Sequence, residues 1–127
     1  MKKVFEDRTV WYKEGTEILH RLDGPAIEYA DGSKFWYKEG KCHRENGPAV
    51  EYNNGDKFWY KDGKHHRLDG PAIERVTGKF WYKEGKYHRL DGPAMEYADG
   101  SKFWYVEGIL YENVNSVEEL IIKMIIE

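Results

Sequence analysis

The sequence predicts an all-β fold: an elongated antiparallel ribbon of five β-hairpin repeats, followed by a C-terminal capping α-helix. The first observation is self-similarity, because five tryptophans head five copies of one unit at spacings of 25, 23, 22 and 23 residues: Trp11, Trp36, Trp59, Trp81 and Trp104. The second is the recurrence of Gly-containing turn signals within the units. The third is a helix-start motif near the end of the sequence.

Composition is typical of a folded protein. Hydrophobic residues make up 40% and aromatic residues 16% of the 127 residues, which is enough apolar surface for a core. The net charge of -3 argues against a generally basic nucleic-acid binder. A single cysteine, Cys42, excludes an intrachain disulfide and a cysteine-based zinc cluster. Without a signal-peptide pattern or an apolar run of about 18 residues, we expect one cytoplasmic domain spanning residues 1–127.

Each unit is predicted to form two short strands, with one turn between them and a second turn to the neighbouring unit. Glu39-Gly40 is a signal for one of these turns, and Asp31-Gly32 is a signal for the other. If both are two-residue turns, Trp36 faces His43 across one hairpin and Ile27 across the other.

Differences in unit length predict differences in the turns. Two extra residues in the first unit, around residues 15–17, indicate a longer turn, and the shorter third unit suggests a three-residue turn at residues 76–78. If all turns have two residues, equivalent side chains of successive units point to the same face only when the unit has an even number of residues. The usual unit has 23 residues, so one extra residue must be absorbed by a bulge. We place that bulge at Gly47-Pro48 and its equivalents, because proline cannot donate to the strand ladder.

Alternation along the strands then assigns the repeated side chains to two faces. The face of the tryptophans is expected to carry Ile27, Tyr29, Trp36 and His43, and the opposite face Phe35, Tyr37, Glu28 and Arg44.

The run K-F-W-Y-K-E-G-K-Y-H-R-L-D-G-P-A-M-E-Y-A-D-G resembles a MORN repeat. It is similar to the MORN-variant repeats of bacterial and phage proteins, some of them antitoxin-like, and the similarity covers about residues 8–112. The Trp, Gly-Lys, His and Asp-Gly positions of this run coincide with those of the MORN pattern. Two positions differ: the family usually has Gly after His, where this sequence has Arg, and Gly-Pro-Ala replaces the family's next glycine. The resemblance implies a scaffold or binding surface, and it does not imply an enzyme.

Four repeated histidines raise the question of metal binding. Equivalent atoms in successive repeats lie roughly 10 Å apart, whereas zinc needs ligands at about 2.0–2.1 Å. We therefore expect no metal and no cofactor, and a structural role in which each His packs on a Trp across the hairpin and bonds through a ring nitrogen to the backbone near the bulge. Near-complete repetition also argues against an enzyme, because a catalytic site needs non-equivalent residues.

Two roles stay open for the arginines, which precede an Asp or Asn by two residues. Each can bridge to that Asp or to a repeated Glu, or the row of guanidinium groups beside aromatic rings can bind phosphates, nucleobases or an acidic partner. The candidate ligand- or partner-binding residues are Arg21, Arg44, Arg67, Arg89, His43, His66, His88, Trp36, Trp59 and Trp81.

These features favour a non-catalytic binding or scaffold module that contacts a protein partner through an aromatic and Arg/His-lined surface. The alternative is a phage or antitoxin-type inhibitor that sequesters a small, nucleotide-like anion, and a phage-encoded protein would act in the host cytoplasm. We expect no nucleic-acid duplex as a partner and no membrane span.

The segment 116–127 is predicted to be the capping helix. Ser116 and Glu119 form a capping box, and apolar residues follow at helical spacing: Val117, Leu120, Ile121, Met124 and Ile125. Such a helix either covers the open end of the ribbon or pairs with another subunit or partner, in which case it would mediate a homo-oligomer.

Overall fold

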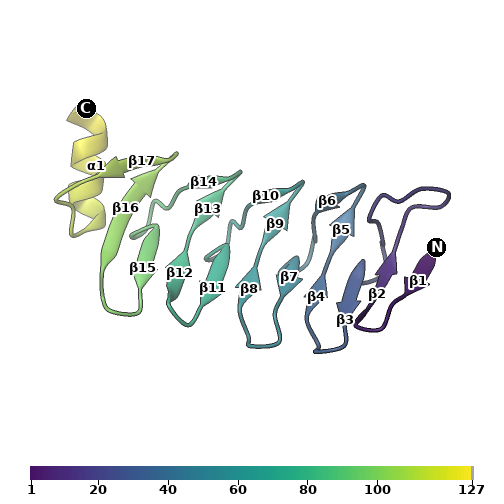
Figure 1. The fold of residues 1–127 in the computed structure, drawn as a ribbon. Helices are drawn as coiled ribbons and strands as arrows, with labels where there is room; N and C mark the ends of the chain where they lie inside the picture. Colours follow the sequence, from purple (N-terminus) through teal and green to yellow (C-terminus); the bar gives the residue numbers. More distant parts are fainter. Residues whose placement is uncertain (127) are drawn as a thin grey trace.

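The structure is a computed structural model that describes residues 1–126; Glu127, the last residue of the predicted helical segment, lies outside the described residues. Two rows of short antiparallel hairpins form an elongated ribbon, with helix α1 (Val117–Ile126) at one end (Figure 1). The predicted all-β ribbon with a helical cap is confirmed.

The first row is an antiparallel sheet of eleven strands. In spatial order they are β1 (Lys2–Val4), β2 (Arg8–Trp11), β3 (Ile27–Tyr29), β4 (Lys34–Phe35), β7 (Val50–Glu51), β8 (Lys57–Phe58), β11 (Ile73–Arg75), β12 (Gly78–Phe80), β15 (Met95–Tyr97), β16 (Lys102–Val106) and β17 (Ile109–Tyr111). The second row contains three separate hairpins: β5 (Tyr37–Lys38) with β6 (Lys41–Cys42), β9 (Tyr60–Lys61) with β10 (Lys64–His65), and β13 (Tyr82–Lys83) with β14 (Lys86–Tyr87). The long strand β16 extends from the first row into the second, where β17 continues the series of hairpins (Figure 1).

The turns of the second row match the prediction. Lys38 pairs with Lys41 across two turn residues, Glu39 and Gly40, which both have positive φ. The backbone N–H of His43 donates to the carbonyl of Trp36 at 3.1 Å, so these two residues face each other as expected. The first unit has the expected longer turn, because its flanking pair is Tyr12 with Leu19 and Lys13 N–H donates to the carbonyl of Ile18.

The turns of the first row differ from the prediction. Ile27 pairs with Phe35 and not with Trp36, because the turn after Tyr29 has three residues, 30–32. Gly32, with φ 96°, closes this turn in the left-handed conformation of a type I turn with a bulge. The shorter third unit has the two-residue turn instead, since Arg75 pairs with Gly78. The extra residue of a 23-residue unit therefore lies in this turn and not at Gly47-Pro48.

The strands are interrupted between the two rows of hairpins in the second, third and fourth repeats. Strand geometry is interrupted at Trp36, and residues 43–49 connect β6 to β7 as a loop. The predicted kink at Gly47-Pro48 falls within this loop, but the loop breaks the strand over seven residues where a single bulged residue was expected.

The core lies on one face of the ribbon, called here the inner face. Val50, Phe58, Ile73 and Phe80 form a buried cluster, and Tyr60 of the second row packs against it. Along the main sheet, Val10 pairs with Ile27, and from Ile27 onward aliphatic or Met side chains alternate with phenylalanines from strand to strand, in the order Ile27, Phe35, Val50, Phe58, Ile73, Phe80, Met95 and Phe103. Tyrosine rings extend this row, as where Tyr29 lies edge-to-face on Phe35 at 5.4 Å.

The opposite face, called here the Trp/Arg face, carries the repeated Trp, Arg, Glu and Lys side chains. Arg44 Cζ lies 3.8 Å from the ring centre of Trp36, and Arg44 also reaches Glu51. The predicted faces were therefore wrong for Ile27 and Tyr29, which belong to the inner face, and for Arg44 and Glu28, which belong with the tryptophans. A one-residue change of register moves side chains to the other face.

Glutamates and lysines alternate in one line across the Trp/Arg face of the main sheet. The register places Glu28, Lys34, Glu51, Lys57, Glu74, Lys79, Glu96 and Lys102 on successive strands. Opposite charges on neighbouring strands stabilise a sheet by about 0.2–1 kcal/mol per pair. This pairing accounts for the recurrence of Glu on one strand of each repeat and Lys on the next.

Helix α1 closes the end of the sheet at β16 and β17. Leu120 is 1% exposed and packs in a cluster with Trp104, Val106 and Val114. The predicted capping box is present in modified form, because Glu119 N–H donates to Ser116 Oγ at 3.2 Å and the Glu119 carboxylate accepts from Asn115 N–H at 2.8 Å. Within residues 1–126, no helix is long and apolar enough to cross a membrane.

One inner-face residue gives the fold a dependence on pH. The His65 ring lies between Tyr60 and Tyr82, at 4.2 and 4.9 Å, and its Nδ1 atom is buried without a hydrogen-bond partner among the described residues. Burial, with a smaller contribution from Arg75, lowers the pKa of His65 below its ordinary value of 6.5. The unfolded chain therefore binds the proton more readily, so stability falls as the pH drops from about 6.5 through the lowered pKa.

His65→Tyr is expected to reduce this loss of stability in acid. The sister repeat already has tyrosine at the same position, where Tyr82 and Tyr87 stack at 4.3 Å, so the new ring fits the row. Urea unfolding at pH 7.5 and 5.5 measures the change for each protein. The reciprocal variant Tyr87→His should increase acid sensitivity, and equal pH dependence in all three proteins would contradict the assignment.

Candidate binding clefts between adjacent repeats

Each complete repeat contains a guanidinium group stacked on an indole ring. The Cζ atoms of Arg21, Arg44, Arg67 and Arg89 lie 3.8, 3.8, 3.9 and 3.9 Å from the ring centres of Trp11, Trp36, Trp59 and Trp81. The glycine of the Gly-Pro-Ala motif permits this stack, because a Cβ atom at Gly70 would lie 2.9 Å from Arg67 Cζ. The motif therefore makes room for the arginine.

Hydrogen bonds hold each arginine in this position. Arg67 donates from Nε to Asp69 at 2.9 Å, and from Nη1 to the carbonyl of Pro71 at 3.0 Å and to Glu74 at 3.3 Å. Arg21 and Arg89 make the same three interactions in their own repeats. The predicted bridging of arginine to Asp and Glu is confirmed, and the guanidinium group beside Asp69 lowers the pKa of that carboxyl.

The repeated histidines join one repeat to the next. His43 Nδ1 accepts the backbone N–H of Asp62 at 3.0 Å, and that residue lies in the turn of the following repeat. The turn residues Glu39, Glu84 and Glu107 donate in the same way to His20, His66 and His88. A ring nitrogen bonded to the backbone was predicted, but the predicted partner near the Gly47-Pro48 bulge was wrong: the bond goes to the turn of the following repeat, which local sequence spacing does not reveal.

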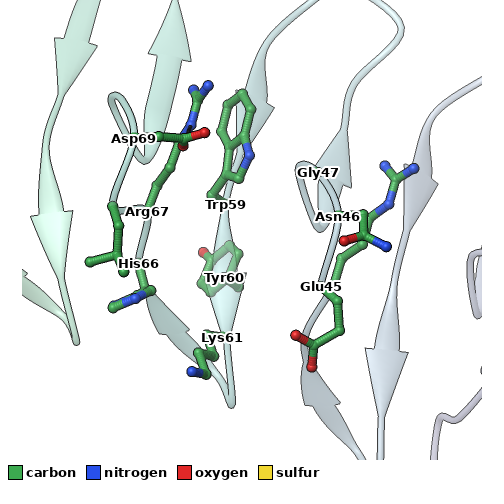
Figure 2. Close-up of a pocket in the computed structure, with 11 residues that line it drawn as sticks. Glu45, Asn46, Gly47, Trp59, Tyr60, Lys61, His66, Arg67 and Asp69 are labelled. Atoms are coloured by element: carbon green, nitrogen blue, oxygen red, sulfur yellow. Dashed lines mark hydrogen bonds and ion pairs between the residues drawn. The ribbon is translucent and has the colours of Figure 1, made fainter.

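Equivalent clefts lie on the Trp/Arg face between adjacent repeats. The central cleft has a volume of about 560 Å³ and is bordered by the loops that begin at Arg44 and Arg67. Figure 2 shows Trp59, Tyr60 and Lys61 between these loops, with Arg67 and His66 on one side and Asn46 on the other. Two further clefts, of about 500 and 610 Å³, repeat this arrangement around Trp36 and Trp81.

The predicted site residues share this face. The lining of the three clefts includes all ten of them: Trp36, Trp59, Trp81, Arg21, Arg44, Arg67, Arg89, His43, His66 and His88. The guanidinium groups do not converge on one point, since each stacks on the tryptophan of its own repeat.

Exposed leucines are a feature that the sequence reasoning missed. Leu22, Leu68 and Leu90 line the clefts and are 76%, 79% and 54% exposed. Each leucine lies between the repeated arginine and Asp-Gly-Pro. A large apolar residue at this loop position was the sequence feature that could have indicated an exposed contact residue. The lysines of the second row, among them Lys38, Lys61 and Lys83, add positive charge to the same clefts.

Cys42 lies apart from these clefts, on the inner face. Burial raises the pKa of its thiol to about 12, so the group is protonated and a poor nucleophile near neutral pH.

Comparisons with protein-family models, with curated proteins and with solved structures gave no match. The similarity to MORN repeats therefore stays a prediction that rests on the motif positions in the sequence.

Proposed function

We propose that this protein is a non-catalytic binding module of the cytoplasm, which holds an extended segment of a partner protein along its Trp/Arg face. The observation that carries the proposal is the row of equivalent clefts. Each contains a stacked Arg–Trp pair, and the residue that follows the arginine lines the cleft as Glu45, Leu68 or Leu90. Leu22, Leu68 and Leu90 give these clefts exposed apolar side chains, and covering apolar surface favours association with a partner.

The repeat spacing suits an extended peptide. Two strands at about 4.8 Å each advance the ribbon by roughly 10 Å per repeat. An extended or polyproline II chain advances about 3.1–3.4 Å per residue, so every third residue of the partner would reach the next cleft. Partner residues at that spacing would find Leu22, Leu68 and Leu90 in the first, third and fourth repeats.

The chemistry of the clefts supports this function more than the sequestration of a small anion, the other function that the sequence allows. A pocket for a small anion would gather several cations at one place. The arginines instead stack on separate tryptophans, and Arg21, Arg67 and Arg89 are each already paired with two carboxylates.

Selection from a displayed peptide library tests the proposal. We expect enriched peptides with apolar side chains at every third position, and binding of about tenfold or more lower affinity in the triple variant Leu22→Ser, Leu68→Ser, Leu90→Ser. These leucines are exposed, so the fold should be nearly unaffected.

The matched control is Val76→Ser, which removes an apolar side chain that is 85% exposed in a turn of the main sheet. It should leave peptide affinity unchanged. Failure to enrich any peptide that distinguishes the triple variant from the wild type would overturn the proposal.

A further inference from the structure

The second repeat differs from its sisters at one charged contact. In the other three repeats, the Arg Nε atom donates to an aspartate two residues later: Arg21 to Asp23, Arg67 to Asp69 and Arg89 to Asp91, at 2.9, 2.9 and 2.8 Å. Asn46 occupies this position in the second repeat. Arg44 keeps its stack on Trp36 and its bonds to Pro48 and Glu51, but among the described residues its Nε atom has no acceptor.

The acidic groups around Arg44 do not replace the missing carboxylate. Glu45 is held by His43 Nε2 at 2.7 Å, and this hydrogen bond lowers the pKa of the Glu45 carboxyl. Glu51 lies on the Nη1 side at 3.4 Å. The Arg44 side chain is also more open than its sisters, at 29% exposed against 21% for Arg67.

Arg44 lines two clefts, the central one and the one around Trp36. Asn46 lines the same two clefts, and the central one also contains Trp59 and Lys61 (Figure 2). The three sister repeats show which ligand the Nε edge of the arginine takes when it is occupied, namely a carboxylate. An Arg side chain binds a carboxylate with two parallel N–H bonds where its edge is free.

We propose that Arg44 binds an aspartate or glutamate side chain of the partner segment, in the place that Asp23, Asp69 and Asp91 occupy in the sister repeats. This inference rests on the proposed binding function and names the group that the partner contributes at the second repeat. The second repeat also has Glu45 where its sisters have an exposed leucine. The acidic contact therefore fixes the register of the segment, between one apolar contact before it and two after it.

The test uses NMR of the arginine Nε–H groups, with acetate as the probe. At constant ionic strength, acetate should shift the Arg44 Nε–H resonance saturably and leave those of Arg21, Arg67 and Arg89 in place. Asn46→Asp should abolish the acetate response, because it supplies the carboxylate within the chain. The variant should be at least as stable as the wild type, so unfolding does not explain the loss.

Asp69→Asn is the matched control, because it opens the equivalent edge of Arg67. A second acetate-responsive resonance is expected in this variant. The proposal is overturned if acetate does not shift the Arg44 resonance, if Asn46→Asp responds like the wild type, or if inorganic phosphate binds this edge more tightly than acetate.

The outcome for this site can be separated from that for the proposed function. Selected peptides that bind wild type and Asn46→Asp equally well would leave the binding function intact and overturn the Arg44 contact. A saturable acetate response without any selected peptide would support the carboxylate site and overturn the peptide-binding function.

Discussion

Leu120→Ser is expected to lower the free energy of unfolding by about 3 kcal/mol, because it removes a fully buried apolar side chain and leaves a polar group in its place. Leu120 is 1% exposed and joins helix α1 to Trp104, Val106 and Val114 at the end of the ribbon. Urea unfolding followed by circular dichroism measures the loss, and hydrogen exchange over residues 117–126 shows whether the helix has separated from the sheet.

Ile125→Ser is the matched control on the same helix. Ile125 is 77% exposed, so the same type of substitution should change the stability by only a few tenths of a kcal/mol. Equal effects of the two substitutions would contradict the docking of α1 through Leu120. Truncation before Ser116 should have a larger effect, because it exposes the whole cluster beneath the helix.

Arg67→Ala is expected to lower the free energy of unfolding by about 3 kcal/mol. It removes hydrogen bonds to Asp69, Pro71 and Glu74 and the stack on Trp59, and it leaves the Pro71 carbonyl without this donor. Thermal and urea unfolding measure the loss.

Two further variants isolate the cause of that loss. Arg67→Lys keeps the positive charge but cannot make the planar, forked contact, so most of the loss should remain. Lys57→Ala removes the same charge from an exposed position and should cost much less. If Lys57→Ala and Arg67→Ala have the same effect, net charge rather than the Arg–Trp contact stabilises the repeat.

The repeated hairpins could be predicted from the sequence because their signals are local. Glu39 and Gly40 form the expected two-residue turn, and Trp36 faces His43 as spacing alone indicates. The turn at Asp31-Gly32 shows the limit of this reasoning. The same dipeptide fits a two-residue turn or the end of a three-residue turn, and choosing the shorter turn moved Ile27 to the wrong face.

The candidate site was found by residue type, but its geometry could not be predicted. The arginines follow the strands and lie in loops, where side-chain alternation no longer applies, so the stack of Arg44 on Trp36 was missed. The bond from Asp62 to His43 joins residues in two repeats, and nothing in the spacing specifies it. The site therefore depends both on contacts within a repeat, such as the Arg44–Trp36 stack, and on contacts between repeats, such as the Asp62–His43 bond.

The histidine bonds described above each connect a repeat only to the following one, from His20 onward to Glu107. A chain of units coupled in this way opens from its ends. The two ends differ, because Leu120 secures the end at α1 whereas every residue of β1 is exposed. A protease acting on the folded protein should therefore trim it from the β1 side, leaving a ladder of C-terminal fragments that shorten in steps of 22, 23 or 25 residues.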